Sequence, residues 1–193
     1  MDAQPCLFDL PLAPKIPLPE GFRYQDNLIT PQEEADLVVR FQDLPFKPYE
    51  HLGYFGNRRI AGFGWRQEEA GRMVETGEPI PGVLLPLLEK VAAFTGLVQD
   101  SFRHALVTEY SPGAGIGWHR DRPPAVAVAG VSLLSPCAFR LRRKAGDRWE
   151  RSTITAAPRS AYLMSGPARS DWQHSIPEVE ALRYSVTFRT VRR

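Results

Sequence analysis

The stretch FRHALVTEYSPGAGIGWHRDRPPAVAVAGVSLL, residues 102–134, decides the fold. It contains two apolar runs with strand character, FRHALVTEY at 102–110 and AVAVAGVSLL at 125–134, separated by Gly, Pro and Asp. Four similar runs follow along the chain: CAFRLRR, STITAA, SAYLMSG and RYSVTFRTV. Short strands at this spacing, downstream of helices, predict an α+β protein with a double-stranded β-helix (jelly-roll) core and N-terminal helices packed on one face.

Two helices are expected upstream of these strands. Thr30-Pro31-Gln32-Glu33 combines an N-cap, a proline at the first helical position and a capping-box glutamate, which predicts an amphipathic helix over 30–44. A second apolar face at helical spacing predicts a helix over 83–94, ended by Gly96. Between them, the Gly- and aromatic-rich residues 51–67 have hairpin character.

The chain length and composition indicate one globular domain. Of 193 residues, 43% are hydrophobic and 24% are charged, which is ordinary for a soluble protein. Residues 1–22 contain five prolines and predict an extended leader, followed by a single domain over 23–193. A net charge of +2 is too small to establish nucleic-acid binding by itself.

Cysteine use and hydropathy predict a cytoplasmic protein. Cys6 and Cys137 are the only cysteines, so neither a disulfide framework nor a zinc knuckle is expected. The N-terminus lacks the basic start and apolar core of a signal peptide. The apolar run at 125–134 is about half the length that spans a bilayer, so no membrane association is expected. We expect a monomer.

The pair His119-x-Asp121 is the first candidate site. Residues i and i+2 of an extended segment face the same side, so an imidazole and a carboxylate can meet one point. His174, at a later strand end, can supply the third ligand of a two-histidine, one-carboxylate facial triad for non-haem Fe(II). A polar turn or a structural histidine is the alternative for the isolated pair. His104 lacks a ligand-like neighbour in sequence and is interpreted as structural.

The C-terminal strand Arg183-Tyr-Ser-Val-Thr-Phe-Arg189 carries the second candidate site. Alternation places Arg183, Ser185, Thr187 and Arg189 on one face and three apolar or aromatic residues on the other. Two arginines on an inner face suit a dicarboxylate such as 2-oxoglutarate, because each guanidinium can bind a carboxylate with two hydrogen bonds. A solvent-exposed edge strand with a polar outer face is the alternative.

These motifs, in this order, resemble the AlkB family of Fe(II)/2-oxoglutarate dioxygenases. The resemblance covers residues 22–193 and is most specific from Val107 onward. It is closest to branches other than the best-known bacterial DNA-repair enzyme. The segments that carry it are TEYSPGAGIGWHRD, GVSLLSP, SGPARSDWQH and RYSVTFR.

The resemblance implies the cofactors and their ligands. His119, Asp121 and His174 would hold Fe(II), with 2-oxoglutarate and O₂ as co-substrates. Arg183 and the Tyr110 hydroxyl would bind the distal carboxylate of 2-oxoglutarate, and Arg189 would anchor it near the metal. The family's usual asparagines are replaced here by hydroxyl residues that can still form hydrogen bonds, Thr108 and Ser185.

The resemblance also implies the reaction and a substrate class. Hydroxylation of an N-methyl group on DNA or RNA would release formaldehyde, with succinate and CO₂ as co-products, as in DNA repair. Pro123 stands where base-repairing members often carry an acidic residue, so a protein or small-molecule substrate is the alternative. A non-enzymatic binding domain and a cupin isomerase are further alternatives, which the intact ligand set and paired arginines disfavour.

Candidate substrate contacts come from aromatic residues interleaved with arginines, a pattern that can stack an extruded base and hold its phosphates. Packing of the same aromatics into the barrel is the alternative. The candidates are Phe63, Trp65, Arg59 and Trp172.

Overall fold

The computed structural model describes residues 18–51, 54–67, 73–75, 78–121 and 125–191. Most of the predicted leader, residues 1–22, lies outside these ranges, as does Pro123 with its two neighbours. Within the described residues, no helix is long and apolar enough to cross a membrane.

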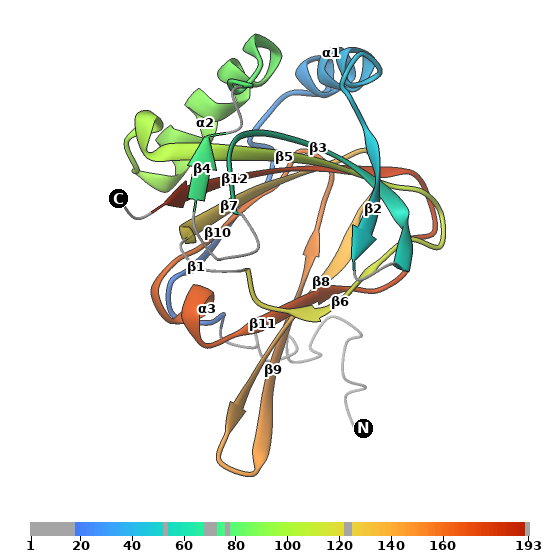
Figure 1. The fold of residues 1–193 in the computed structure, drawn as a ribbon. Coiled ribbons are helices and arrows are strands. Elements are labelled where there is room, and N and C mark those ends of the chain that lie inside the picture. Colours follow the sequence, from blue (N-terminus) through green and yellow to red (C-terminus); the bar gives the residue numbers. More distant parts are fainter. Residues whose placement is uncertain (1–17, 52–53, 68–72, 76–77, 122–124, 192–193) are drawn as a thin grey trace, which may run out of the picture.

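The strands form two antiparallel sheets (Figure 1). The larger sheet has the order β1-β10-β7-β12-β5-β3-β2, with β4 paired to β3. Its strands are β1 (Phe22–Gln25), β2 (Lys47–His51), β3 (Tyr54–Gln67), β4 (Met73–Glu75), β5 (Phe102–Tyr110), β7 (Ala125–Leu133), β10 (Ala161–Met164) and β12 (Arg183–Val191). The smaller sheet has the order β6-β11-β8-β9. Its strands are β6 (Ile116–His119), β8 (Cys137–Ala145), β9 (Arg148–Ala156) and β11 (Gln173–Ile176). This two-sheet arrangement confirms the predicted double-stranded β-helix.

Two helices cover the outer side of the larger sheet (Figure 1). Helix α1 (Pro31–Phe41) has the predicted capping box, in which Thr30 Oγ1 accepts from the Glu33 amide and Glu33 Oε2 accepts from the Thr30 amide. Helix α2 (Leu85–Thr95) ends at Gly96, whose φ of 71° is the left-handed conformation that glycine favours. Both helices are shorter than predicted, because residues 42–44 leave the helix and Gly82–Leu84 form a separate 3₁₀ turn, η1. Two further short elements are η2 (Gln99–Ser101) and α3 (Gly166–Ser170).

The alternation of strand β12 separates two apolar cores. Tyr184, Val186 and Phe188 pack under the helices, in the helix-side core. A second cluster, the inter-sheet core, contains Phe139 and Trp172 and fills the space between the two sheets. The opposite face of β12, which carries Arg183 and Arg189, therefore looks into the space between the sheets, as the sequence pattern predicts.

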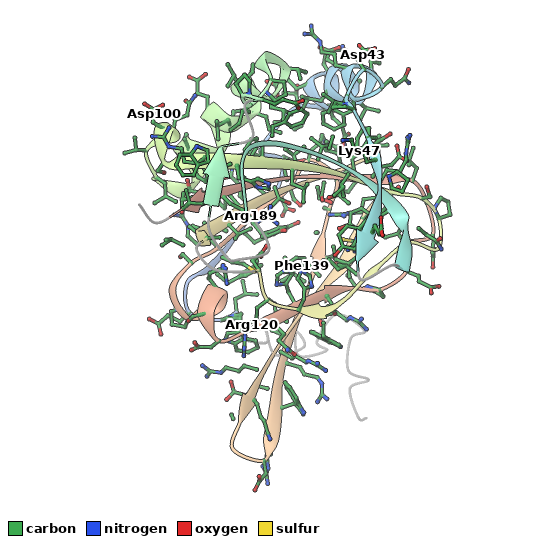
Figure 2. The ribbon with its side chains drawn as sticks, in the orientation of Figure 1. Asp43, Lys47, Asp100, Arg120, Phe139 and Arg189 are labelled. Atoms are coloured by element: carbon green, nitrogen blue, oxygen red, sulfur yellow. The ribbon has the colours of Figure 1, made fainter. Side chains whose placement is uncertain are left out.

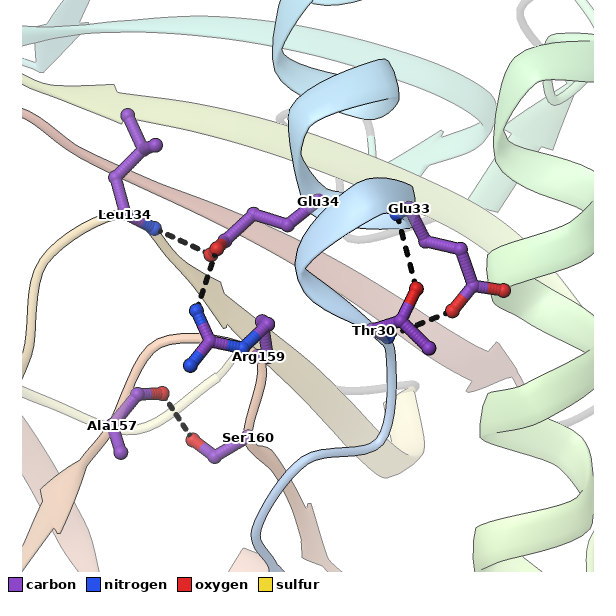
Figure 3. A network of polar contacts seen from close by, with 7 residues as sticks. All are labelled: Thr30, Glu33, Glu34, Leu134, Ala157, Arg159 and Ser160. Atoms are coloured by element: carbon purple, nitrogen blue, oxygen red, sulfur yellow. Dashed lines mark hydrogen bonds and ion pairs between the residues drawn. The ribbon is translucent and has the colours of Figure 1, made fainter.

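Glu34 ties helix α1 to the loops at one end of the sheets. Its carboxylate accepts a hydrogen bond from the Leu134 amide at 2.8 Å and pairs with Arg159 Nη1 at 2.8 Å (Figure 3). Glu34 is buried, so this pair is shielded from water and replaces the hydration that the carboxylate loses. Helix α1 is thus held to the barrel by polar contacts as well as by Leu37 and Phe41.

Candidate active site

His119 and His174 lie opposite each other on paired strands. They are direct partners in the register of β6 and β11, and their ring centroids are 4.1 Å apart. Nδ1 of His119 lies 2.8 Å from the Gly117 carbonyl oxygen, which can only accept, so Nδ1 carries the proton. Nε2 is therefore the nitrogen left for another partner.

Asp121 lies beside this histidine pair. Its Oδ2 is 3.7 Å from His174 Nε2, and Oδ2 is buried without a hydrogen-bond partner among the described residues. The other oxygen, Oδ1, accepts from Nε and Nη2 of Arg189 at 3.1 and 2.9 Å. A buried carboxylate oxygen without a donor is costly, which indicates that Oδ2 is placed for a cation.

The protonation states of these groups suit a cation site. Burial alone would raise the pKa of Asp121, but the Arg189 guanidinium holds it well below its usual range, so Asp121 is ionised. Burial lowers the pKa of His174 to about 3, so its ring is neutral at pH 7. An ionised carboxylate and neutral imidazoles are the forms that ligate a metal.

The three side chains are close in pairs but are not gathered around one point. In the described part of the chain, no group of three or more His, Cys, Asp or Glu side chains has its donor atoms arranged for a metal ion. His119 and Asp121 each approach His174. The sheet fixes the backbones of His119 and His174, and Asp121 lies two residues beyond the end of β6.

Arg183 is a buried cation in the space between the sheets. Only 1% of it is exposed, and its Nε donates to Ser132 Oγ at 3.1 Å. Its guanidinium lies 4.9 Å from the centre of the Tyr110 ring, while Nη1 is buried without a hydrogen-bond partner among the described residues. A buried guanidinium with a free donor is a receptor for an anion.

Thr108 and Ser185 lie next to this arginine. They are direct partners across β5 and β12, and Ser185 also faces Ser132 on β7. Both are buried. The strand pairing thus brings together the two hydroxyl residues that replace the family's asparagines. They lie two residues along their strands from Arg183 and Tyr110, which are also register partners.

Arg189 contacts a residue that the sequence analysis interpreted as only structural. Nη1 of Arg189 lies 3.2 Å from His104 Nδ1. Burial, followed by the nearby Arg189 charge, lowers the pKa of His104 to about 3, so its neutral ring can accept this hydrogen bond. Arg189 therefore bridges Asp121 and His104. His104 on β5 and Arg189 on β12 are register partners, so an alignment of these two strands could have revealed the contact.

The candidate substrate residues are divided by the alternation of β3. Phe63 is buried in the helix-side core, so it does not line the space between the sheets. Arg59 is on the same outer side and pairs with Glu109, with Nη2 2.7 Å from Oε2. The neighbouring Arg58 faces the opposite way, donates to the Gly115 carbonyl at 3.1 Å and lies opposite Tyr110 in the register. Arg58, and not the predicted Arg59, is therefore the arginine on the side of the sheet that faces the space between the sheets.

The two candidate tryptophans have different settings. Trp65 is half-buried and follows Gly64, whose φ of 77° interrupts the regular alternation of β3. Trp172 is buried in the inter-sheet core, with the Arg143 guanidinium 5.1 Å from its ring centre. Its indole Nε1 is buried without a hydrogen-bond partner among the described residues. Trp172 is two residues before His174, so its position is linked to that of the candidate ligand.

Comparison with known proteins agrees with this geometry. The sequence profile described as "2OG-Fe(II) oxygenase superfamily" matches residues 21–189. The chain belongs to this superfamily. Membership places it among the Fe(II)- and 2-oxoglutarate-dependent oxygenases, a class of oxidoreductases, and its relatives show that it is AlkB-like.

Two relatives carry names of AlkB homologues. The chain is 29% identical to the Alkylated DNA repair protein ALKBH8 homolog of Arabidopsis thaliana over 194 residues, covering 86% of this chain and 54% of that protein. It is 29% identical to the DNA oxidative demethylase ALKBH2 of Homo sapiens over 126 residues, covering 58% of this chain and 48% of that protein. The chain thus spans about half the length of each relative.

A solved structure supports the same fold. The structure of OsALKBH1 superposes with a TM-score of 0.66 at 15% identity, covering 88% of this chain and 96% of that one. The 2OG-Fe(II) oxygenase fold is therefore retained although the sequences have diverged.

Proposed function

We propose that His119, Asp121 and His174 hold Fe(II). The observation that carries this proposal is the buried Oδ2 of Asp121, which has no hydrogen-bond partner among the described residues and lies 3.7 Å from His174 Nε2. Neutral histidines and an ionised carboxylate are the donor set that non-haem iron enzymes use. The three residues lie at adjoining strand ends, so the proposal requires a reorientation of side chains and not a change of fold.

The co-substrate 2-oxoglutarate would occupy the space between the sheets next to Arg183. The free Nη1 of Arg183 supports this assignment, because it offers a buried donor to the distal carboxylate beside the Tyr110 ring. Thr108 and Ser185 extend the polar surface on the adjacent strand positions. When bound, iron and 2-oxoglutarate supply the oxidising chemistry, with O₂ consumed and succinate and CO₂ released.

The residues around the site would orient its polar groups and exclude water. Arg189 fixes the Asp121 carboxylate through Oδ1, which leaves Oδ2 facing His174. Phe139 stacks on His174, with centroids 5.4 Å apart and an interplanar angle of 17°, and limits rotation of that ring. Figure 2 shows Arg189 and Phe139 between the two sheets. These contacts restrict the Asp121 carboxylate and the His174 ring, so a smaller reorientation would bring the donors together.

We infer that the reaction is the oxidative demethylation of alkylated nucleobases in DNA or RNA. Hydroxylation of an N-methyl group gives an unstable hemiaminal that releases formaldehyde, so no hydrolytic residue is needed. The names of the two AlkB homologues support a nucleic-acid substrate. Arg58 is the register partner of Tyr110, which pairs with Arg183, and this further cation supports an anionic substrate.

The test is formaldehyde release from a panel of methylated single-stranded DNA, duplex DNA, tRNA and peptide. We expect formaldehyde and an equal amount of succinate from a methylated oligonucleotide, and neither product from His174→Ala. Formaldehyde from the peptide alone would replace the nucleic-acid substrate by a protein. Failure of every substrate, together with absence of Fe(II) binding, would reject the oxygenase activity.

A further inference from the structure

The outer face of the smaller sheet carries arginines interleaved with tryptophans. We call this surface the basic–aromatic face and define it by the residues Trp118, Arg140, Arg142, Lys144, Trp149 and Arg151. Strand alternation places these side chains on the side of β8 and β9 opposite Phe139 and Leu141, which are buried in the inter-sheet core. The face therefore lies outside the candidate active site.

Arg142 is at the centre of this face. Its guanidinium lies 4.3 Å from the Trp118 ring centre and 4.4 Å from the Trp149 ring centre. Its Nε donates to Gln173 Oε1 at 2.8 Å. The two rings and this hydrogen bond restrict the position of the guanidinium and leave its Nη groups for a further acceptor.

Arg140 repeats the arrangement one step along the strand. Its guanidinium lies 5.1 Å from the Trp118 ring centre, and its Nε donates to Ser175 Oγ at 3.0 Å. Arg151 is the direct partner of Arg142 on β9, and Lys144 is the direct partner of Trp149. The cations thus form an extended row across β8 and β9.

No carboxylate neutralises this row within the described residues. The ion pairs found there involve other cations, and none includes Arg140, Arg142, Lys144 or Arg151. The opposite side of the same hairpin differs, because Arg143 pairs with Glu150 there. Four cations without counter-charges on one face repel each other, so their arrangement is explained by an anionic partner.

We propose that the basic–aromatic face binds a single strand of nucleic acid outside the active site. Phosphates along the strand would contact the arginines and Lys144, and a base would stack on Trp149, which is 40% exposed. The flat, ring-held guanidiniums suit phosphate oxygens, which accept two hydrogen bonds from one arginine. The choice of ligand rests on the proposed function, whereas the face itself is defined by its contacts.

The face is also connected to the candidate metal ligands. Trp118 directly precedes His119 on β6, and Gln173 directly precedes His174 on β11. Trp118 and Gln173, two of the three residues that contact Arg142, therefore lie on the outer side of the strands whose inner side carries both histidines. A nucleic-acid strand bound to this face would keep its neighbouring nucleotides near the candidate metal ligands.

Fluorescence anisotropy with the full chain and an unmethylated, fluorescein-labelled 15-nucleotide DNA tests the proposal without any turnover. We expect Arg142→Gln and Arg151→Gln each to weaken binding about three- to tenfold and to reduce the slope of log affinity against log salt by about 1. Trp149→Ala is expected to weaken binding about fivefold or more. The matched control is Arg40→Gln, an exposed arginine of α1 on the far side of the protein.

Several outcomes would overturn the proposed binding of nucleic acid to the basic–aromatic face. These are equal affinity in wild type and the Arg142 and Arg151 variants, an equal loss in Arg40→Gln, or binding to phosphatidylserine vesicles without binding to the oligonucleotide. Arg151→Gln and Lys144→Gln change exposed side chains and keep the test valid if Arg142→Gln is unstable. If formaldehyde release is normal and the face variants bind the oligonucleotide as tightly as wild type, the binding role of the basic–aromatic face is rejected and the proposed function stands. Oligonucleotide binding that depends on the face, without release from any methylated nucleic acid, rejects the proposed function alone.

Discussion

Arg189 contacts Asp121 through a single carboxylate oxygen. Nε and Nη2 of Arg189 both donate to Oδ1, at 3.1 and 2.9 Å. In the described part of the chain, Oδ2 is buried without a hydrogen bond and faces His174. One arginine on β12 thereby fixes both the charge and the direction of the carboxylate that follows β6. The orientation of this one carboxylate is therefore set by a contact within the protein.

Arg189→Lys tests this positioning role. Lysine keeps the charge but cannot direct two aligned donors at one oxygen, so we expect turnover to fall about 10- to 100-fold. The measurement is succinate formation, with kcat and KM for 2-oxoglutarate determined separately. Arg40→Lys on helix α1 serves as the control. Full turnover in Arg189→Lys would show that charge alone is sufficient.

Arg183→Met separates binding from stability. The variant removes a buried cation whose Nη1 has no hydrogen-bond partner in the part of the chain that the structure describes. The unfolding free energy of the metal-free protein should therefore stay unchanged or rise by about 1–2 kcal/mol. Affinity for 2-oxoglutarate should fall about tenfold or more, because the charged donor of its distal carboxylate is lost. Urea unfolding and isothermal titration measure the two effects. A less stable variant with normal affinity would contradict this role.

Gly130→Ala tests the close approach of β7 to Tyr162. A Cβ at residue 130 would lie 2.3–2.5 Å from atoms of the Tyr162 ring, which is stacked on Phe22 and packed against Phe139. We expect a loss of about 1–3 kcal/mol in unfolding free energy, because the ring must leave a filled core. Gly82→Ala, where nothing lies within 4 Å of the added Cβ, should be close to neutral in thermal unfolding.

Glu109 predicts a pH-dependent part of the stability. Hydrogen bonds from Arg59 lower the pKa of this carboxyl, which also accepts from the Tyr184 hydroxyl at 2.8 Å. Because the folded-state pKa is lowered, the ionised carboxyl stabilises the fold at pH values above the unfolded-state pKa of about 4.5. This stabilisation is lost as the pH falls through the lower folded-state pKa.

Glu109→Gln should therefore reduce the unfolding free energy by about 1–2 kcal/mol at pH 7. This loss is smaller than for a fully buried ion pair, because Arg59 is half-exposed and water screens its charge. The difference between variant and wild type should shrink below about pH 4.5. Urea unfolding at several pH values gives the comparison. A difference that is the same at pH 3 and pH 7 would show that the ion pair is not its origin.

Local sequence patterns predicted the elements that depend on local rules. The strand at Arg183–Val191 has the predicted bounds, because its alternation of arginines and hydroxyls with aromatic and branched residues assigns each side chain to one of the two faces. The capping box at Thr30 and Glu33 also formed as predicted, because both partners lie within one helical turn.

Contacts between distant strands were not predictable in the same way. Arg58 and Arg59 are adjacent, and only the register of β3 against β5 decides which of them faces Tyr110 and which faces Glu109. The contact of His104 with Arg189 likewise depends on the pairing of β5 with β12. The short strands Phe22–Gln25, Ile116–His119 and Gln173–Ile176 contain too few residues to show a period of their own.

The central claim is that His119, Asp121 and His174 hold Fe(II) together with 2-oxoglutarate. Anaerobic addition of Fe(II) and 2-oxoglutarate to the full chain tests it through the visible metal-to-ligand charge-transfer band. We expect the band in wild type and, at saturating 2-oxoglutarate, in His104→Gln, and we expect none in His174→Ala. Absence of the band in wild type, or an unchanged band in His174→Ala, would contradict the claim.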